Sequence, residues 1–255
     1  MRAMPSEEDV IELSGRVAKI LLENGAETSR VEGTAEYIGR AAGLELSCHA
    51  TMTAVFVDAQ TEAHTHLIKV RTGDFNLQKV DEINSVSRQF VAGHLSFDDL
   101  QRRIAAIDRK VIDFTWVQKI IGAGLVSIAP MLLFKATWGD LAWAFGVGIA
   151  GYLAAQWVGH QTKTPYITSA VGGFTIAVLA VLLVHLDWAV SSDNIIISAL
   201  MPLVPGVALT NSLRELIGKH TISGMVRAVD AILVAVAIGG GVVLGSVLVQ
   251  LVMGA

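Results

Sequence analysis

The chain has 255 residues, of which 53% are hydrophobic and only 16% are charged, and 24 of them are glycine. This composition excludes an intrinsically disordered chain, and the single cysteine excludes a disulfide scaffold. The net charge of -4 and the lack of a basic run give no support to nucleic-acid binding.

The charges are unevenly divided along the chain. Residues 1–113 carry 13 Lys/Arg and 18 Asp/Glu, whereas residues 114–255 carry 6 and 5. All five tryptophans and 17 of the 24 glycines lie in the second part. We therefore expect a cytosolic α+β domain over 1–110, followed by an all-α polytopic membrane domain over 111–255.

The N-terminal part begins with two predicted helices. Apolar residues at helical spacing predict an amphipathic helix that ends at Asn24-Gly25. For the second helix, Ser29 is a candidate cap and Glu32, three residues later, its capping-box partner. Its predicted end is Gly43.

The hydrophobic period then changes to that of strands. Short β-branched or alternating runs predict strands over 45–49, 51–58 and 64–71, the last two forming a hairpin. A helical period returns between Leu77 and Phe90, and Ser96 with Asp99 begins one more helix.

The C-terminal part contains apolar segments long enough to cross a membrane, which takes about 20 residues. Tryptophans at or near the ends of these segments agree with the preference of indole rings for the membrane interface. Five transmembrane helices are predicted, near 116–134, 141–158, 166–186, 195–213 and 224–253.

The basic residues predict how the chain is oriented in the membrane. With a cytosolic N-terminal domain, eight Lys or Arg residues near the spans lie inside, whereas Lys135 alone lies outside. This pattern follows the positive-inside rule and places the C-terminus outside. We expect a multi-pass membrane protein whose N-terminal domain lies in the cytosol.

The predicted fourth span is interrupted by a Pro-x-x-Pro-Gly segment. Pro202 and Pro205 remove backbone donors and free carbonyl groups, which hydrocarbon cannot satisfy. Transporters use such broken helices to bind substrates near the middle of the membrane. Gly206 permits close approach, and Thr210 and Asn211 offer polar groups just beyond. The alternatives are a kink that only shapes helix packing and a helix that ends at the inner membrane interface.

Three ionisable residues follow the break and complete the candidate substrate site. Arg214 can bind a carboxylate bidentately. Arg227 and Asp230 share a face of the fifth predicted span, where they either contact substrate or form an intrahelical ion pair near the cytosol. The glycines near 146–151 and 239–245 predict close helix–helix packing.

Other chemistries find little support in the sequence. His64 and His66 share one side of a predicted strand near Cys48, but no tight metal-ligand motif is present. Nucleophile elbow, Walker A and dinucleotide motifs are also absent. We expect no cofactor, no bound metal and no enzymatic reaction, and we expect transport to draw on a gradient or a partner.

Two segments carry a resemblance to a known family. The segment 24-NGAETSRVE-32, and 202-PLVPG-206 with 210-TNSLRELIGKHTISGMVRAVDA-231, resemble the threonine/serine exporter family over nearly the whole chain. With only five predicted spans, the chain is most similar to the YjjP-type subunits. The resemblance implies a bacterial cytoplasmic (inner) membrane and a smaller YjjB-type membrane partner of four or five spans, and a higher oligomer stays open.

The resemblance also implies a function. It predicts a transporter subunit that exports succinate-like dicarboxylates or threonine and serine. Capping leaves Glu27 and Arg30 unexplained, so they are, with Glu32, candidates for gating or interdomain contact. Two alternatives stay open: a membrane-anchored cytosolic hydrolase or metal-dependent enzyme, and a non-transporting regulator that senses a metabolite.

Overall fold

The computed structural model describes residues 5–59, 65–71, 75–110, 114–133, 137–162 and 164–254. The chain forms two compact units. The first unit contains Met1–Ile112 together with Val207–Ala228, and the second contains Asp113–Gly206 together with Val229–Ala255. These units differ from the two contiguous domains predicted from the sequence, because a C-terminal segment clusters with the N-terminal part of the chain.

The first unit begins with helices α1 (Glu7–Glu23) and α2 (Thr28–Ala41). Ser6 and Asp9 form a capping box that starts α1, and Asn24 caps its end. Gly25 follows with a φ of 88°, a left-handed conformation that favours glycine. The predicted end of the first helix is therefore confirmed.

Three antiparallel strands follow, in the order β1-β2-β3. They are β1 (Leu46–Ala50), β2 (Ala54–Ala59) and β3 (Thr65–Lys69). Strands β2 and β3 are paired neighbours, as predicted for the hairpin. His64 lies outside the described residues. Among the residues that the structure describes, no three His, Cys, Asp or Glu side chains are placed to hold a metal ion.

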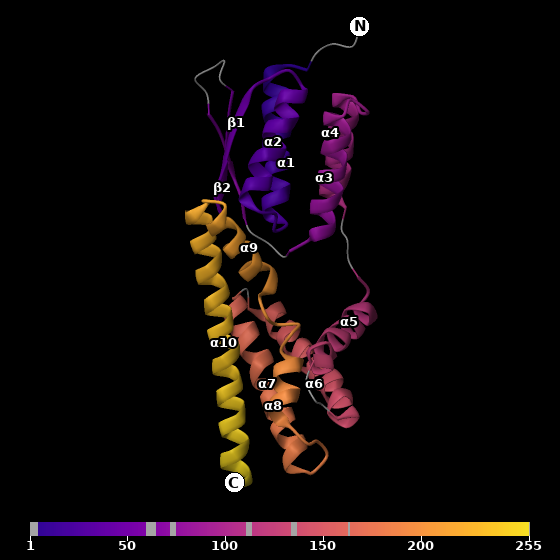
Figure 1. The fold of residues 1–255 in the computed structure, drawn as a ribbon, viewed down its shortest axis with the longest axis vertical. Coiled ribbons are helices and arrows are strands. Elements are labelled where there is room, and N and C mark those ends of the chain that lie inside the picture. Colours follow the sequence, from indigo (N-terminus) through magenta and orange to yellow (C-terminus); the bar gives the residue numbers. More distant parts are fainter. Residues whose placement is uncertain are drawn as a thin grey trace. The chain divides into compact units, whose positions relative to one another are not determined.

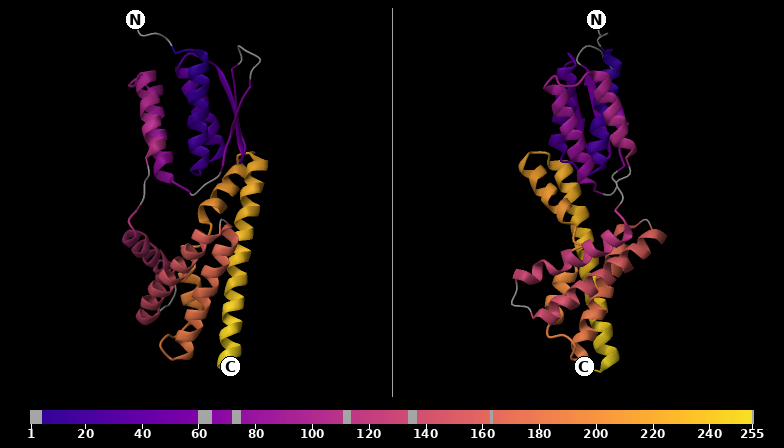
Figure 2. Two further views of the ribbon diagram at one scale, coloured as in Figure 1. Left: turned by 180° about the vertical axis from the view of Figure 1, so that it is seen from behind. Right: turned by 90° about the vertical axis from the view of Figure 1, so that its right-hand side faces the viewer.

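Helices α1 and α2 form the middle layer of the first unit. The sheet packs on one side of them, and α3 (Leu77–Val91) and α4 (Phe97–Arg109) pack on the other (Figures 1 and 2). The core combines the apolar stripes of all four helices with alternate residues of the strands. Ser96 caps α4 and accepts the Asp99 N–H, as predicted.

Cys48 points from β1 into this core. Its side chain is buried, and its N–H donates to Glu36 at 3.2 Å. Burial raises the pKa of the thiol from 9.0 to about 12, and the nearby carboxylates of Glu32 and Glu36 add to the rise. Cys48 is the only cysteine of the chain, so it can report on the opening of the first unit.

The second unit is helical. It contains α5 (Trp116–Ile128), the 3-10 turn η1 (Pro130–Leu133), α6 (Trp138–Gln161), α7 (Pro165–His185) and α8 (Ser192–Ala199). Helix α6 contacts α5, α7 and α8. Two further helices follow, α9 (Gly206–Ile217) and α10 (Thr221–Met253). The boundaries between the two units fall at the start of α9 and within α10.

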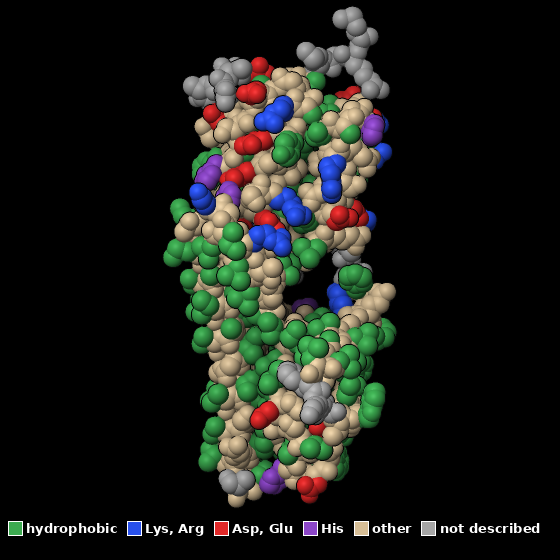
Figure 3. Space-filling view, in the orientation of Figure 1, with side chains coloured by type: hydrophobic (Ala, Val, Ile, Leu, Met, Phe, Trp, Pro, Cys, Tyr) green, Lys and Arg blue, Asp and Glu red, His purple; other side chains and the backbone are tan. Residues whose placement is uncertain are grey.

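Four helical segments in the described part of the chain are long and apolar enough to cross a membrane: Trp116–Leu133, Trp138–Gln161, Tyr166–His185 and Thr221–Met253. Much of the surface of α10 is hydrophobic, whereas charged side chains cover the elements of the first unit (Figure 3). The predicted fourth span is divided between α8 and α9, with 8 and 12 residues, and each is too short to span alone.

Glycines set the distance between α7 and α10 within the second unit. A Cβ on Gly241 would lie 2.1 Å from the Ala170 carbonyl oxygen, and one on Gly245 would lie 2.7 Å from that of Phe174. The two glycines are four residues apart and so share a face. Gly240 meets nothing within 4 Å, so the close contact predicted for this glycine run belongs to part of it only.

The environment of Cys48 predicts slow thiol chemistry. At pH 8 we expect native Cys48 to react with a maleimide at least about a hundredfold more slowly than in denaturant, because burial and the raised pKa leave little accessible thiolate. Ser47→Cys in a Cys48→Ala background is the control, since Ser47 is exposed on the same strand. Equal native labelling rates for the two cysteines would contradict the burial of Cys48.

The glycine contacts predict opposite effects for neighbouring substitutions. We expect Gly241→Ala to destabilise the second unit by about 1–3 kcal/mol, because its Cβ meets backbone that cannot move aside. Gly240→Ala should be neutral or stabilising, because alanine favours the helix and the space is open. Thermal unfolding in detergent measures both, and equal midpoints for the two variants would count against this packing.

Candidate polar site of the first unit

The candidate site begins with the loop between α1 and α2. Asn24 is fixed at the end of α1, where its amide donates to the Ile20 carbonyl at 2.7 Å. The Phe75 ring packs against Gly25, and a Cβ there would lie 2.0 Å from a ring atom. The loop is thus held in a shape that directs the carbonyl groups of Gly25 and Ala26 toward side chains of α9 and α10.

The helical hairpin of α9 and α10 supplies those side chains. The chain reverses at Gly218 and Lys219, and Lys219 has a φ of 66°. A Cβ on Gly224 would lie 3.0 Å from the Leu216 nitrogen, so the two helices pack closely at the turn. This hairpin brings Arg227 of α10 to Glu215 of α9, with its Nε 3.1 and 3.2 Å from the two carboxylate oxygens.

The loop and the hairpin together form one buried polar network. Glu215 also accepts hydrogen bonds from the Thr28 N–H at 3.1 Å and the Thr28 hydroxyl at 2.9 Å. Arg227 donates to the Ala26 carbonyl at 3.0 Å, and the Asn211 amide donates to the Gly25 carbonyl at 2.9 Å. The residues joined in this way are between 186 and 201 residues apart in the sequence.

The charges in this network are almost completely removed from water. The side chains of Arg227 and Glu215 are 4% and 1% exposed. Burial of two ions costs several kcal/mol each, which only close pairing and full hydrogen bonding can offset. Here the carboxylate accepts from a guanidinium, a backbone N–H and a hydroxyl, so the pair is neutral and well satisfied.

Two further contacts lie at the edge of the network. Arg214 forms an ion pair with Glu27, the residue that precedes α2, and more than half of the Arg214 side chain is exposed. Glu32 accepts the Ala50 N–H at 2.9 Å and lies 3.2 Å from His49 Nδ1 and 3.8 Å from His220 Nδ1. This edge is more accessible to solvent than the Arg227–Glu215 pair.

The predicted capping box at Ser29 is wrong. Helix α2 begins at Thr28, with Glu27 at its N-cap and no side-chain cap bond. The Glu32 carboxylate is instead bound to the backbone of β1, and Thr28 uses its N–H and hydroxyl on Glu215. The tertiary partner Glu215 thus takes the N–H group that a local cap would otherwise satisfy.

The remaining predicted site residues lie at the break before α9, on α9 itself within the first unit, and on the part of α10 that belongs to the second unit. Helix α8 ends at Ala199 and α9 begins at Gly206, so the predicted interruption is present, and it contains Pro202 and Pro205. Thr210 is exposed on α9. The passage from the second unit to the first falls between Gly206 and Val207.

Arg227 and Asp230 do not form the intrahelical ion pair that was one of the alternatives predicted for them. Asp230 accepts a hydrogen bond at 2.7 Å from the Tyr166 hydroxyl of α7, within the second unit. Arg227 is engaged by Glu215 and Ala26 in the first unit. The two residues lie on the same helix, but each bonds to residues of a different unit.

Sequence reasoning missed Glu215 and Thr28 as members of the site. One signal was available: Asn211 and Glu215 are four residues apart and therefore share a face of α9. A glutamate on the face that carries a buried amide indicates a polar partner across that face. Thr28 gave no comparable signal, because a threonine at a helix start is common for local reasons.

Comparison with known proteins identifies the family. The model described as "Putative threonine/serine exporter" matches residues 12–249. The chain belongs to the threonine/serine exporter family. The resemblance rests on the α1–α2 loop, the Pro-Gly segment 202–206 and the α9–α10 hairpin, and the structure joins the first and the last of these in the polar network. No solved structure matches the chain.

Three curated relatives show the range of the family. The "Probable succinate transporter subunit YjjP" of Klebsiella aerogenes is 24% identical over 251 residues, with 96% of each chain covered. The "Probable threonine/serine exporter" of Mycobacterium tuberculosis is 20% identical over 92% of this chain. The "Pheromone-regulated membrane protein 10" of Kluyveromyces lactis is 27% identical over 91% of this chain. The chain spans 45% and 25% of the last two proteins.

The buried pair predicts a large loss of stability when one partner is removed. We expect Arg227→Met and Glu215→Leu each to lower the free energy of unfolding of the first unit by about 3–5 kcal/mol, because each leaves a buried charge unpaired. The double variant should recover part of that loss. Denaturant titration in detergent, with Cys48 labelling as the readout, measures these changes.

The exposed pair of the same network provides the matched control. Arg214→Gln and Glu27→Gln should each change the free energy of unfolding by less than about 1 kcal/mol, because water screens a partly exposed pair. If Arg214→Gln destabilised as strongly as Arg227→Met, burial would not be what distinguishes the two arginines.

Proposed function

We propose that this chain is a subunit of a transporter that exports small carboxylates, either succinate-like dicarboxylates or the amino acids threonine and serine. Membership of the threonine/serine exporter family supports export. A relative covered over 96% of its length is named as a succinate transporter subunit. We further propose that the partner is a smaller YjjB-type membrane protein.

In this proposal the chain crosses the membrane five times. The four long apolar helices supply the first, second, third and fifth crossings. Helices α8 and α9 together supply the remaining crossing, the fourth along the chain, as a broken helix. The basic residues between the spans support a cytosolic N-terminal domain over 1–110 and an outer C-terminus in a bacterial inner membrane. An odd number of crossings agrees with a pathway completed by a partner.

The single observation that carries the proposal is the Arg214–Glu27 pair. Arg214 follows the Pro-Gly break, its side chain is largely exposed, and it already binds a carboxylate. A carboxylate on a substrate can make a charge-assisted contact in place of Glu27, and the guanidinium geometry also allows a bidentate one. The other residues that we propose to take part in substrate binding are Pro202, Pro205, Gly206, Thr210, Asn211, Arg227 and Asp230.

The buried network connects this exchange of carboxylates at Arg214 to the position of the α9–α10 hairpin. Arg227 and Glu215 bind α9 and the start of α10 to the loop before α2, so this hairpin moves with the first unit. When a substrate carboxylate replaces Glu27, the Arg214–Glu27 ion pair beside the buried network is lost. We propose that the passage at Gly206 acts as the hinge and that Glu27 and Glu32 take part in gating.

Efflux from proteoliposomes tests the proposed function. Vesicles are loaded with labelled succinate, threonine or serine, and contain this chain with or without the co-purified partner. We expect efflux of at least one compound when the partner is present. Arg214→Gln should lower that efflux roughly tenfold or more, since it removes a charge-assisted bond of about 1.5–3 kcal/mol.

Lys219→Gln is the matched control for this experiment. Lys219 is an exposed basic residue at the turn of the same hairpin and should leave efflux unchanged. Absence of efflux for all three compounds, with the partner present, would argue against the transporter. Full efflux from Arg214→Gln would remove Arg214 from the proposed substrate site.

A further inference from the structure

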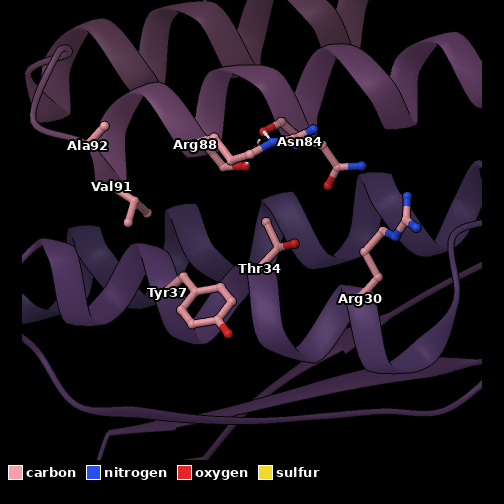
Figure 4. Close-up of a pocket in the computed structure, with 8 residues that line it drawn as sticks. Arg30, Thr34, Tyr37, Asn84, Arg88, Val91 and Ala92 are labelled. Atoms are coloured by element: carbon pink, nitrogen blue, oxygen red, sulfur yellow. Dashed lines mark hydrogen bonds between the residues drawn. The ribbon is translucent and has the colours of Figure 1, made fainter. Parts of the chain in front are cut away.

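A groove of about 680 Å³ lies between α2 and α3 in the first unit (Figure 4). Two of its eight lining residues are arginines, and none of the eight is acidic. The side chains that matter for recognition come from both helices: Arg30, Thr34 and Tyr37 from α2, and Asn84, Arg88 and Val91 from α3. In a chain of net charge -4, this groove presents positive charge only.

One end of the groove is polar and cationic. Arg30 extends from α2 toward α3, and the Asn84 side chain points from α3 into the groove (Figure 4). Arg30 makes no hydrogen bond or ion pair with any residue that the structure describes. The Arg88 Nε donates to the Asn84 carbonyl at 3.1 Å, which anchors this guanidinium and leaves its terminal nitrogens for a ligand.

The other end of the groove is apolar. Val91, Ala92 and the ring of Tyr37 line it, and the Tyr37 ring also carries the Arg40 guanidinium at 6.0 Å from its centroid. Tyr37 and Val91 are 58% and 47% exposed, so this surface is accessible. Its volume falls in the range of small-molecule sites, in which a few polar groups orient a ligand on apolar walls.

We propose that this groove binds a small organic carboxylate that carries an apolar body. Arg30 and the terminal nitrogens of Arg88 bind the carboxylate, with Asn84 and the Thr34 hydroxyl as further hydrogen-bond partners. The apolar body rests on Tyr37 and Val91. A cationic ligand is repelled by both arginines, and an inorganic anion leaves the apolar end unfilled.

The site has a direct connection to the polar network. Arg30 lies on the first turn of α2, two residues after Thr28, which donates to Glu215. A ligand that holds Arg30 therefore holds the helix turn that binds the α9–α10 hairpin. The binding proposal itself does not depend on transport and stands or falls separately.

Equilibrium binding to the full chain in nanodiscs tests the site. Hexanoate is the probe, hexylamine has the same chain with the opposite charge, and inorganic phosphate is an anion without a body. We expect hexanoate to bind and the other two to bind at least tenfold more weakly. Hexylamine or phosphate binding as tightly as hexanoate would overturn the proposal, as would no hexanoate binding above empty nanodiscs.

Variants place the binding in the groove. Arg30→Gln and Arg88→Gln should each weaken hexanoate binding at least tenfold, and Val91→Glu should do so by repulsion from an exposed position that folding does not require. Arg102→Gln is the control, because Arg102 is an exposed arginine paired with Asp99 outside the groove. Unchanged binding in all three groove variants, with native thermal midpoints, would also overturn the proposal.

Discussion

The ion pair between Arg227 and Glu215 is the interaction on which the organisation of the first unit depends. The pair itself links α9 to α10, and the same two side chains bind Thr28 and Ala26 at the start of α2, 187 and 201 residues away in the sequence. Both charges are buried, so the pair is stable only while every donor and acceptor around it is satisfied. A small displacement of the loop would remove hydrogen bonds from a buried charge, so a partly broken network is unfavourable.

The hairpin therefore belongs to the first unit even though it follows four helices of the second. The Pro-x-x-Pro-Gly segment lies where the chain passes from one unit to the other. Prolines interrupt the backbone hydrogen bonds there, so the passage is not a continuous helix. On the C-terminal side, α10 continues into the second unit and packs on α7 through glycines, whose missing side chains allow the two backbones to touch.

Much of the fold follows from local patterns. The C-terminal end of α1, the strand hairpin, the cap of α4 and the long apolar helices were predictable, because capping residues, alternation and hydrophobic length act over a few residues. The break between α8 and α9 was also predictable from its prolines. The capping box at Ser29 was not correct, because Thr28 is bound by a side chain that comes from the far end of the sequence.

The sequence by itself determined the division between charged and apolar parts, the position of the broken helix and the family of the chain. Composition and proline or glycine chemistry decide these features residue by residue. Only the tertiary structure decided which ionisable residues pair: Arg227 with Glu215 rather than with Asp230, and Asp230 with Tyr166. A charge inside a protein takes the partner that packing brings within hydrogen-bond distance, and nearness along the helix does not decide that choice.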